Sequence, residues 1–377
     1  MDTGRLASEF NGRYGSKPRI FRAPGRINLI GEHTDYNGGF VLPCAIDFAT
    51  YVAAAKRDDR NIRVASLNFG RPFEFSLDEL DQAVDTTWAR YVQGVALLLE
   101  RSGRRLVGTD ILIDSTVPVG AGLSSSAALE ISTAFALASI AGHKIEGMQL
   151  AKLGQAAEHE YGGVKSGIMD QFTSVFGQAE HALFLDCRSL AWESIPVSGA
   201  RFVICNTKTK HDLADGEYNK RRAECEEAAR FFGCEFLRDV SLSDFERRSR
   251  EMPENIRKRA RHVLTENERV LKSVEALRKN DLAVLGELIN ESHNSLRDDF
   301  EVSSVELDIM VEIARVERGV LGSRMMGGGF GGCTVNLLSP DAAPNFHKTV
   351  SEKYLEMTGI NCEIYDCRID RGVDEIS

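Results

Sequence analysis

The chain has 377 residues, of which 43% are apolar and 27% are charged, and its formal net charge is −10. Single domains usually contain ~100–200 residues, so we expect two domains. The composition is that of a globular protein. The acidic balance argues against nucleic acid as a partner, because proteins that bind the phosphate backbone carry basic surfaces.

The N-terminus and the cysteines indicate a cytoplasmic protein. The first residues, MDTGRLASEF, lack the basic start and apolar run of a secretory signal. No apolar stretch approaches the ~20 residues of a membrane span, so we expect no membrane partner. The eight cysteines are scattered without a CxxC pair, which favours reduced thiols over disulfides or a zinc site.

The predicted elements alternate between strands and helices in the first half of the chain. β-branched residues and alternation predict strands at 20–22, 50–55, 62–65 and 110–114, and apolar periodicity predicts helices at 88–100, 126–140 and 148–160. The pattern is strongly helical over 219–316. A strand at 333–338, a helix at 343–356 and a strand at 363–369 follow. We expect an α+β fold with domains at 1–190 and 191–377.

The segment PVGAGLSSSAALE at 118–130 predicts an anion site. Gly120 and Gly122 allow tight backbone geometry, and three serines follow, Ser124 to Ser126, before an alanine-rich helix. Backbone N–H groups and the positive end of a helix dipole would then meet at one point, which suits a triphosphate. The segment is not a Walker P-loop, since no GK[ST] follows. A plain turn with a helix cap is the alternative.

The run RAPGRINLIGEHTDYNGG at 22–39 is dense in polar groups. Arg26, Glu32, His33 and Asp35 offer donors and acceptors that suit sugar hydroxyls. The alternatives are a metal site made by the last three residues, which their placement on an irregular loop disfavours, and a solvated turn.

Asp170 stands between the apolar residues Met169 and Phe172 in the run GGVKSGIMDQF. A partly buried carboxylate needs a partner, and Arg26 is a plausible one. The alternative is an ordinary helix-start carboxylate.

A second glycine cluster, GGGFGG, occupies 327–332. Five glycines in six positions cost chain entropy unless the backbone must approach something closely. We expect the cluster to pack beside a ligand or beside the first glycine loop, with a simple hinge as the alternative.

Taken in order, these blocks resemble the GHMP small-molecule kinases. The string at 25–39 is similar to that of galactokinases, as are GIMDQF at 167–172, EYNKRRAEC at 217–225 and ESHNSLRDDFEVS at 291–303. The resemblance covers almost the whole chain. It implies an N-terminal domain like the second domain of ribosomal protein S5, a ferredoxin-like C-terminal domain, and an active site between them.

The resemblance also implies roles for individual residues. It places the sugar at Arg26, Glu32, His33, Asp35, Gly167, Asp170 and Tyr218. It places the triphosphate on Gly120, Ala121, Gly122, Leu123, Ser124, Ser125 and Ser126, Mg²⁺ on Ser126 and Glu158, and adenine near Trp88 and Tyr91. Core packing is the alternative for the two aromatic residues, which share a helix face.

The implied reaction is transfer of the γ-phosphoryl group of ATP to the C1 hydroxyl of galactose, which gives galactose 1-phosphate and ADP and is the entry step of galactose catabolism. Asp170 would act as base or as an electrostatic partner, and Arg26 would stabilise charge. Asp35 and Tyr218 would read the axial hydroxyl that separates galactose from glucose. We expect a monomer or a weak homo-oligomer.

Three other functions stay open on the sequence. The first is a GHMP kinase that acts on N-acetylgalactosamine, arabinose or a uronic acid. The GEHTDY string favours galactose over these substrates, because its Glu-His pair suits a C6 hydroxyl. A non-catalytic galactose sensor is disfavoured because Ser124 to Ala128 are all present. A structural or nucleic-acid role is opposed by the acidic charge. Lys165 and Ser166 stand where many galactokinases carry Asn or Pro and Cys, and Met326 where Thr is usual.

Overall fold

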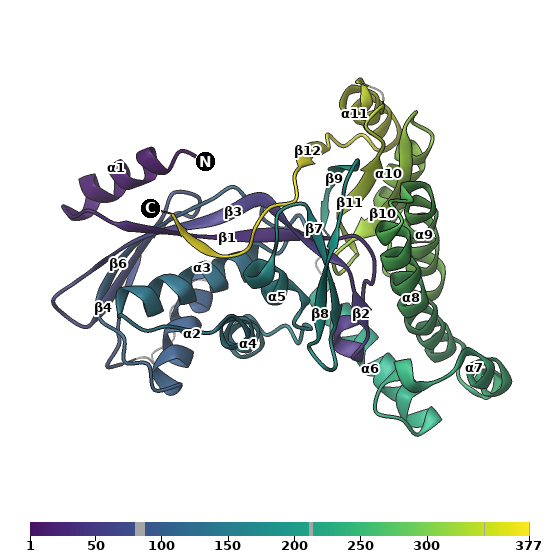
Figure 1. Ribbon diagram of the computed structural model, residues 1–377, viewed down its shortest axis with the longest axis horizontal. Helices are drawn as coiled ribbons and strands as arrows, with labels where there is room; N and C mark the ends of the chain where they lie inside the picture. The colour runs from purple at the N-terminus through teal and green to yellow at the C-terminus, as the bar shows by residue number, and fades with distance from the viewer. Residues whose placement is uncertain (80–86, 211–213, 343, 377) are drawn as a thin grey trace.

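Two groups of helices and strands, one from each half of the chain, make up the fold (Figure 1). The structure is a computed structural model that describes residues 1–377 except 80–86, 211–213, 343 and 377. Helices and strands are mixed in both groups, which confirms the predicted α+β class.

A six-stranded sheet organises the first group in the order β13-β1-β3-β6-β4-β5, antiparallel except between β4 and β6. Its strands are β1 (Arg19–Asn28), β3 (Pro43–Lys56), β4 (Asn61–Ser66), β5 (Phe73–Ser76), β6 (Thr109–Ser115) and β13 (Asp374–Ile376). Successive side chains of a strand face opposite sides of a sheet. Phe21 and Val52 accordingly pack with one set of helices, whereas Ile20 and Ala53 pack with α1 (Thr3–Tyr14) on the other face.

The helices beneath this sheet carry much of the later site. They are α2 (Thr87–Arg101), α3 (Ser125–Ile140), α4 (Gly147–Ala157) and α5 (Met169–Phe176). The eleven buried residues of α3 include both apolar and polar side chains, so this helix is enclosed on most sides. A π-helical turn, Glu158–Gly162, follows α4 directly. Such turns are rare and often lie at functional sites.

A four-stranded sheet in the order β10-β11-β9-β12 organises the second group. Its strands are β9 (Arg201–Lys210), β10 (Val320–Met326), β11 (Gly331–Leu338) and β12 (Glu363–Cys367). Helices α8 (Glu254–Arg278) and α9 (Leu282–Ser295) pack on one face, and α10 (Val305–Arg315) and α11 (Phe346–Thr358) on the other. Helices α6 (Ala214–Phe232) and α7 (Leu242–Arg248) form a further buried cluster with α8.

The two groups share one core at their junction. Ile27 of β1, Leu277 of α8 and Val335 of β11 belong to the same buried apolar cluster. A small sheet of β2 (Phe40–Val41), β7 (His181–Asp186) and β8 (Trp192–Pro196) lies there as well. The chain end then crosses back, so that β13 pairs with β1 (Figure 1). We keep the division at residue 190 as a proposal, with residues 374–376 added to the first half.

Most predicted elements are present. The strands predicted at 20–22, 50–55, 62–65 and 110–114 lie within β1, β3, β4 and β6, and the helices predicted at 88–100 and 126–140 are α2 and α3. The helix predicted at 148–160 is α-helical only to Ala157. The helical stretch 219–316 corresponds to α6 to α10. The sequence pattern missed α1, α5, β2, β5, β7 to β10 and β13.

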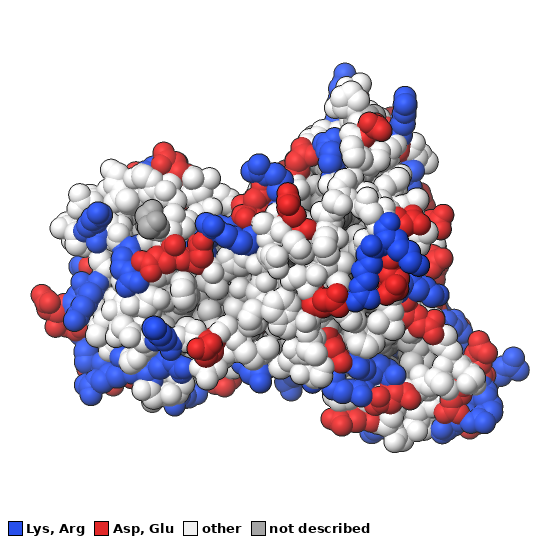
Figure 2. Space-filling model, viewed as in Figure 1, with Lys and Arg blue, Asp and Glu red and all other residues white. Residues whose placement is uncertain are grey.

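Charged side chains of both signs are intermingled on the face shown in Figure 2, and the middle of that face is largely uncharged. Among the described residues, no helix combines the length and the apolar composition needed to cross a membrane.

Candidate active site

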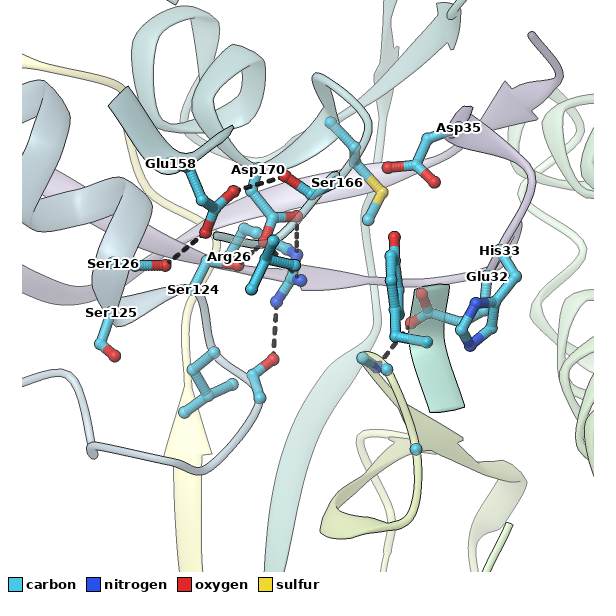
Figure 3. A pocket seen from close by; sticks show the side chains of 18 of the residues that line it. Arg26, Glu32, His33, Asp35, Ser124, Ser125, Ser126, Glu158, Ser166 and Asp170 are labelled. Atoms are coloured by element: carbon cyan, nitrogen blue, oxygen red, sulfur yellow. Dashed lines mark hydrogen bonds and ion pairs between the residues drawn. The ribbon is translucent and has the colours of Figure 1, made fainter. Parts of the chain in front are cut away.

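A cavity of about 330 Å³ lies where the two groups of elements meet. Most of the residues singled out from the sequence line it. They are Arg26, Glu32, His33, Asp35, Gly120, Gly122, Leu123, Ser124, Ser125, Ser126, Glu158, Asp170, Tyr218 and Gly327 to Gly329. Figure 3 shows the serines and Glu158 at one end, Arg26 and Asp170 in the middle, and Glu32, His33 and Asp35 at the other end.

The first glycine loop leads directly into the N-terminus of α3. Gly122 has a φ of +70°, and Ser124, the residue before the helix, has a φ of +60°. Ser124 is not a side-chain cap of α3; its hydroxyl donates instead to Asp170 Oδ2 at 2.5 Å. The capping alternative for Ser124 is therefore wrong. Ser125 and Ser126, in the first turn of this 16-residue helix, line the cavity, so the positive end of the helix dipole lies there, as in an anion site.

The second glycine cluster packs against the first. A Cβ added to Gly122 would lie 3.3 Å from the Met326 carbonyl oxygen, and one added to Gly327 would lie 3.5 Å from Gly122 Cα. The expectation that the cluster lies beside the first glycine loop is confirmed. Met326 itself is 1% exposed, so the side chain that replaces the usual Thr lies in the core below the loop.

Arg26 and Asp170 form an ion pair in the middle of the cavity. Arg26 Nε and one terminal nitrogen donate to the two Asp170 oxygens at 2.9 Å each, and the other terminal nitrogen donates to the Gly122 carbonyl at 2.6 Å. A shift of register in β1 between Pro24 and Arg26 turns this side chain towards the loop. Asp170 stands in the first turn of α5, and its carboxylate also accepts the two hydrogen bonds from Arg26.

Glu32 is held in place by the second half of the chain. The buried Arg324 of β10 donates to Glu32 Oε1 at 3.1 Å, and the Gly327 N–H donates to the same oxygen at 2.9 Å. Arg324 also donates to the carbonyls of Leu29 and Met325. The guanidinium therefore ties β10 to the segment after β1 and leaves the other Glu32 oxygen for a ligand.

His33 occupies an unusual backbone position. Its φ is +61°, a region that His tolerates better than bulkier residues. Tyr36 Oη lies 2.9 Å from Nδ1, whereas Nε2 is buried and has no hydrogen-bond partner among the described residues. Burial, and next the neighbouring charge of His262, lower the pKa of His33 to about 3. The ring is therefore neutral, and it presents one polar nitrogen that a hydroxyl group could satisfy.

Asp35 faces Gly167 and the charge of Asp170. A Cβ added to Gly167 would lie 2.1 Å from Asp35 Oδ2, so only glycine leaves room for this carboxylate. Burial, and next the charge of Asp170, raise the pKa of Asp35 to about 7. The ring of Tyr218 lies 5.5 Å from that of His33 and 5.3 Å from that of Tyr36, and burial raises the pKa of its hydroxyl well above the usual range.

Ser126 and Glu158 lie together at the phosphate end. Ser126 Oγ donates to Glu158 Oε1 at 2.9 Å, and both residues line the cavity. Among the described residues, no three His, Cys, Asp or Glu side chains form a group that could hold a metal. Two hard oxygen donors are nevertheless what Mg²⁺ needs from a protein when phosphates and waters supply the other ligands.

Four predicted residues lie outside the cavity lining. Ala121 is buried in the core, and Gly167 packs behind Asp35. Trp88 stacks on Phe69, with ring centroids 5.6 Å apart, and the Tyr91 ring packs against Gly162. The two aromatic residues are thus not brought to the cavity wall, and their place near adenine stays a prediction.

Several residues that hydrogen-bond to the cavity side chains, directly or through one another, were missed. Arg324 gives only a weak signal, an Arg inside an apolar strand, and Gln171 and Glu130 look like ordinary helix residues. Of the two departures near the sugar, the Lys165 side chain is exposed, whereas Ser166 lines the cavity and donates to Glu158.

Known proteins resemble this chain over its whole length. Residues 8–56 match the galactokinase galactose-binding signature, residues 90–178 the N-terminal domain of GHMP kinases, and residues 273–355 their C-terminal domain. A galactokinase of Roseiflexus sp. (strain RS-1) is 45% identical over 383 residues, which cover 100% of this chain and 98% of that protein. A galactokinase of Chloroflexus aggregans is 46% identical, with 96% and 95% covered.

Solved structures agree with these matches. The structure of Lactococcus lactis galactokinase complexed with galactose is similar with a TM-score of 0.95 at 37% identity, and 100% of both chains is covered. A mevalonate kinase of Methanococcus jannaschii, 19% identical, shares the fold with a TM-score of 0.65 over 94% of this chain and 99% of that one.

Proposed function

The chain belongs to the galactokinases, within the GHMP kinase family, and we propose that Asp170 and Arg26 carry the transfer of the γ-phosphoryl group of ATP to the C1 hydroxyl of galactose. The observation that carries the assignment is the bidentate Arg26–Asp170 pair between the two ends of the cavity. A hydroxyl placed beside Asp170 would face the loop that holds the phosphates. Phosphoryl transfer depends mainly on such positioning and on neutralising charge.

In this proposal Asp170 accepts the hydroxyl proton as the sugar oxygen attacks, and Arg26 stabilises the charge that develops on the transferring group. A purely electrostatic role for Asp170 is the rival. Bound Mg²⁺ would neutralise phosphate charge, with Ser126 and Glu158 as its protein ligands. The backbone from Gly120 to Ser126 would bind the triphosphate through the N-terminus of α3.

The Asp170→Asn variant tests the central role. The loss of a general base usually costs ~10²–10⁴ in rate, so we expect kcat to fall by at least that order. ATP binding, measured by calorimetry, should persist, because the loop amides are unchanged. Near-normal turnover in the variant would contradict the base role.

We assign the reading of the axial hydroxyl to Asp35 and Tyr218. A site built around a substrate hydroxyl rejects analogues that misplace it, because its buried polar groups are then unpaired. Tyr218→Phe, which removes only the hydroxyl, should reduce the preference for galactose over glucose in kcat/KM. An unchanged preference would remove Tyr218 from the assignment.

A cytoplasmic location and a monomeric or weakly associated state complete the proposal. All eight cysteines are free thiols, as is usual in a reducing compartment. Cell fractionation and sedimentation at several concentrations test these two points.

A further inference from the structure

The Glu158 carboxylate has hydrogen-bond partners besides Ser126. Its Oε1 accepts from Ser126, whereas its Oε2 accepts from Gln171 Nε2 at 3.0 Å and from the Ser166 hydroxyl. Gln171 Nε2 also donates to Glu130 Oε2 at 2.9 Å. One amide group of α5 thus joins two carboxyl groups, one from α3 and one from the π-helical turn.

The anchor of this amide is deeply enclosed. Glu130 and Gln171 are both 0% exposed. A Cβ added to Gly154 of α4 would lie 3.0 Å from Gln171 Cγ, so the stem of Gln171 is closely packed as well. Burial, and next the charge of Glu158, raise the pKa of Glu130 well above its usual range. A neutral acid can accept the amide hydrogen without adding a second negative charge beside Glu158.

We propose that Gln171, anchored by Glu130 and assisted by Ser166, is a positioning residue that aims the Glu158 carboxylate at the phosphate end of the cavity. The inference rests on the proposed function, in which Glu158 is a ligand of the nucleotide-bound metal. Loss of a partner that orients a metal ligand usually lowers metal affinity by about 10–100-fold. Ser166 adds a feature of this chain, because a hydroxyl donates more strongly than the thiol found at this place in many galactokinases.

The first test uses Gln171→Leu with Mn²⁺ and ADP, and electron paramagnetic resonance reports the free metal. Mn²⁺ stands in for Mg²⁺ here because both ions prefer oxygen ligands. We expect the dissociation constant of Mn²⁺ in the presence of ADP to rise about tenfold, while the galactose dissociation constant measured by calorimetry is unchanged. The matched control is Thr173→Val on the same helix. Its buried hydroxyl donates only to the Met169 carbonyl in the described contacts, and its loss should change neither constant.

The second test asks whether the anchor works through its shape and acceptor. Glu130→Gln keeps an acceptor for Gln171 and should retain the Mn²⁺ affinity of the wild-type protein. Glu130→Leu removes the acceptor and should weaken Mn²⁺ binding as Gln171→Leu does. Equal affinities for the two variants would contradict the anchoring role of Glu130.

A third pair of variants separates this inference from the proposed function. Ser166→Ala, at a half-buried position that tolerates a smaller side chain, should weaken Mn²⁺ binding by less than the tenfold expected for Gln171→Leu, because the Gln171 amide still holds Glu158 Oε2. This variant carries the test if a core variant does not fold. If Glu158→Ala leaves the affinity for Mn²⁺ unchanged, the proposed metal ligand is wrong. If Glu158→Ala weakens it but Gln171→Leu and Ser166→Ala do not, only the positioning network is wrong.

Discussion

The two ends of the cavity are built in different ways. The phosphate end comes mainly from one short segment, the loop at 120–126 and the N-terminus of α3, with Glu158 of the π-helical turn beside it. The sugar end comes from side chains of segments far apart in the chain, with Glu32 held by Arg324, and His33 and Asp35 set beside Tyr218 and Gly167.

The two ends also differ in how many of their polar side chains have hydrogen-bond partners when no ligand is bound. At the phosphate end, the Ser124 and Ser126 hydroxyls already donate to Asp170 and Glu158. At the sugar end, His33 Nε2 has no hydrogen-bond partner in the part of the chain that the structure describes, and burial favours the neutral form of Asp35. Unpaired buried polar groups cost free energy that a fitting hydroxyl recovers. We infer that affinity for phosphate depends on backbone shape, whereas sugar selection depends on these side chains.

Gly167→Ala should have the largest effect of these variants, and it should affect galactose and not ATP. The new methyl would lie 2.1 Å from Asp35 Oδ2, so the carboxylate must move. A misplacement of about 1 Å can cost roughly 100-fold in rate, so we expect kcat/KM for galactose to fall by that order. ATP affinity, measured by calorimetry in the same samples, should not change. Gly12→Ala, where a methyl meets open space, is the control.

Gly122→Ala should act at the phosphate end alone. Both Gly122 and Gly120 have positive φ, so alanine at either position strains the backbone by ~1–2 kcal/mol. A Cβ at 122 would also press on the Met326 carbonyl, whereas one at 120 would meet nothing. We expect the KM for ATP to rise more in Gly122→Ala than in Gly120→Ala. Equal effects would contradict a role for the contact between the glycine clusters.

Asp35→Asn should weaken galactose binding and yet stabilise the protein without ligand. The folded pKa of about 7 lies above the reference value of 3.8. Between these values the folded chain binds more protons than the unfolded chain, so this group makes stability fall as pH rises. Urea unfolding at pH 8 should show the variant more stable by an amount on the order of 1 kcal/mol, and the gain should shrink towards pH 4. Asp58→Asn, the same substitution at an exposed position, is the matched control.

The glycine loop of the phosphate end was predictable because its features are local. Two glycines, three serines and a helix start within one segment are local features, and so they can be read directly. The Arg26–Asp170 pair spans 144 residues, but a carboxylate among apolar neighbours requires a partner, and that requirement predicted it.

The missed parts depend on contacts that no local pattern encodes. Arg324 is fully buried in β10, where it holds Glu32 across the junction of the two halves. The strand β9 ends in alternating Thr and Lys and is stabilised by pairing with both β11 and β12, which lie more than 100 residues later. The place of Trp88 and Tyr91 near adenine was implied by the family resemblance, and their spacing says which helix face they share but not what that face meets.

The most direct test of the account is release of ADP by the purified protein with Mg-ATP, with galactose, glucose, arabinose and N-acetylgalactosamine assayed in parallel. We predict rapid release with galactose and little with the other three sugars, because the sugar end is arranged around particular hydroxyls. Absence of release with every sugar, while calorimetry still detects galactose binding, would contradict the assignment of a kinase and favour a galactose sensor.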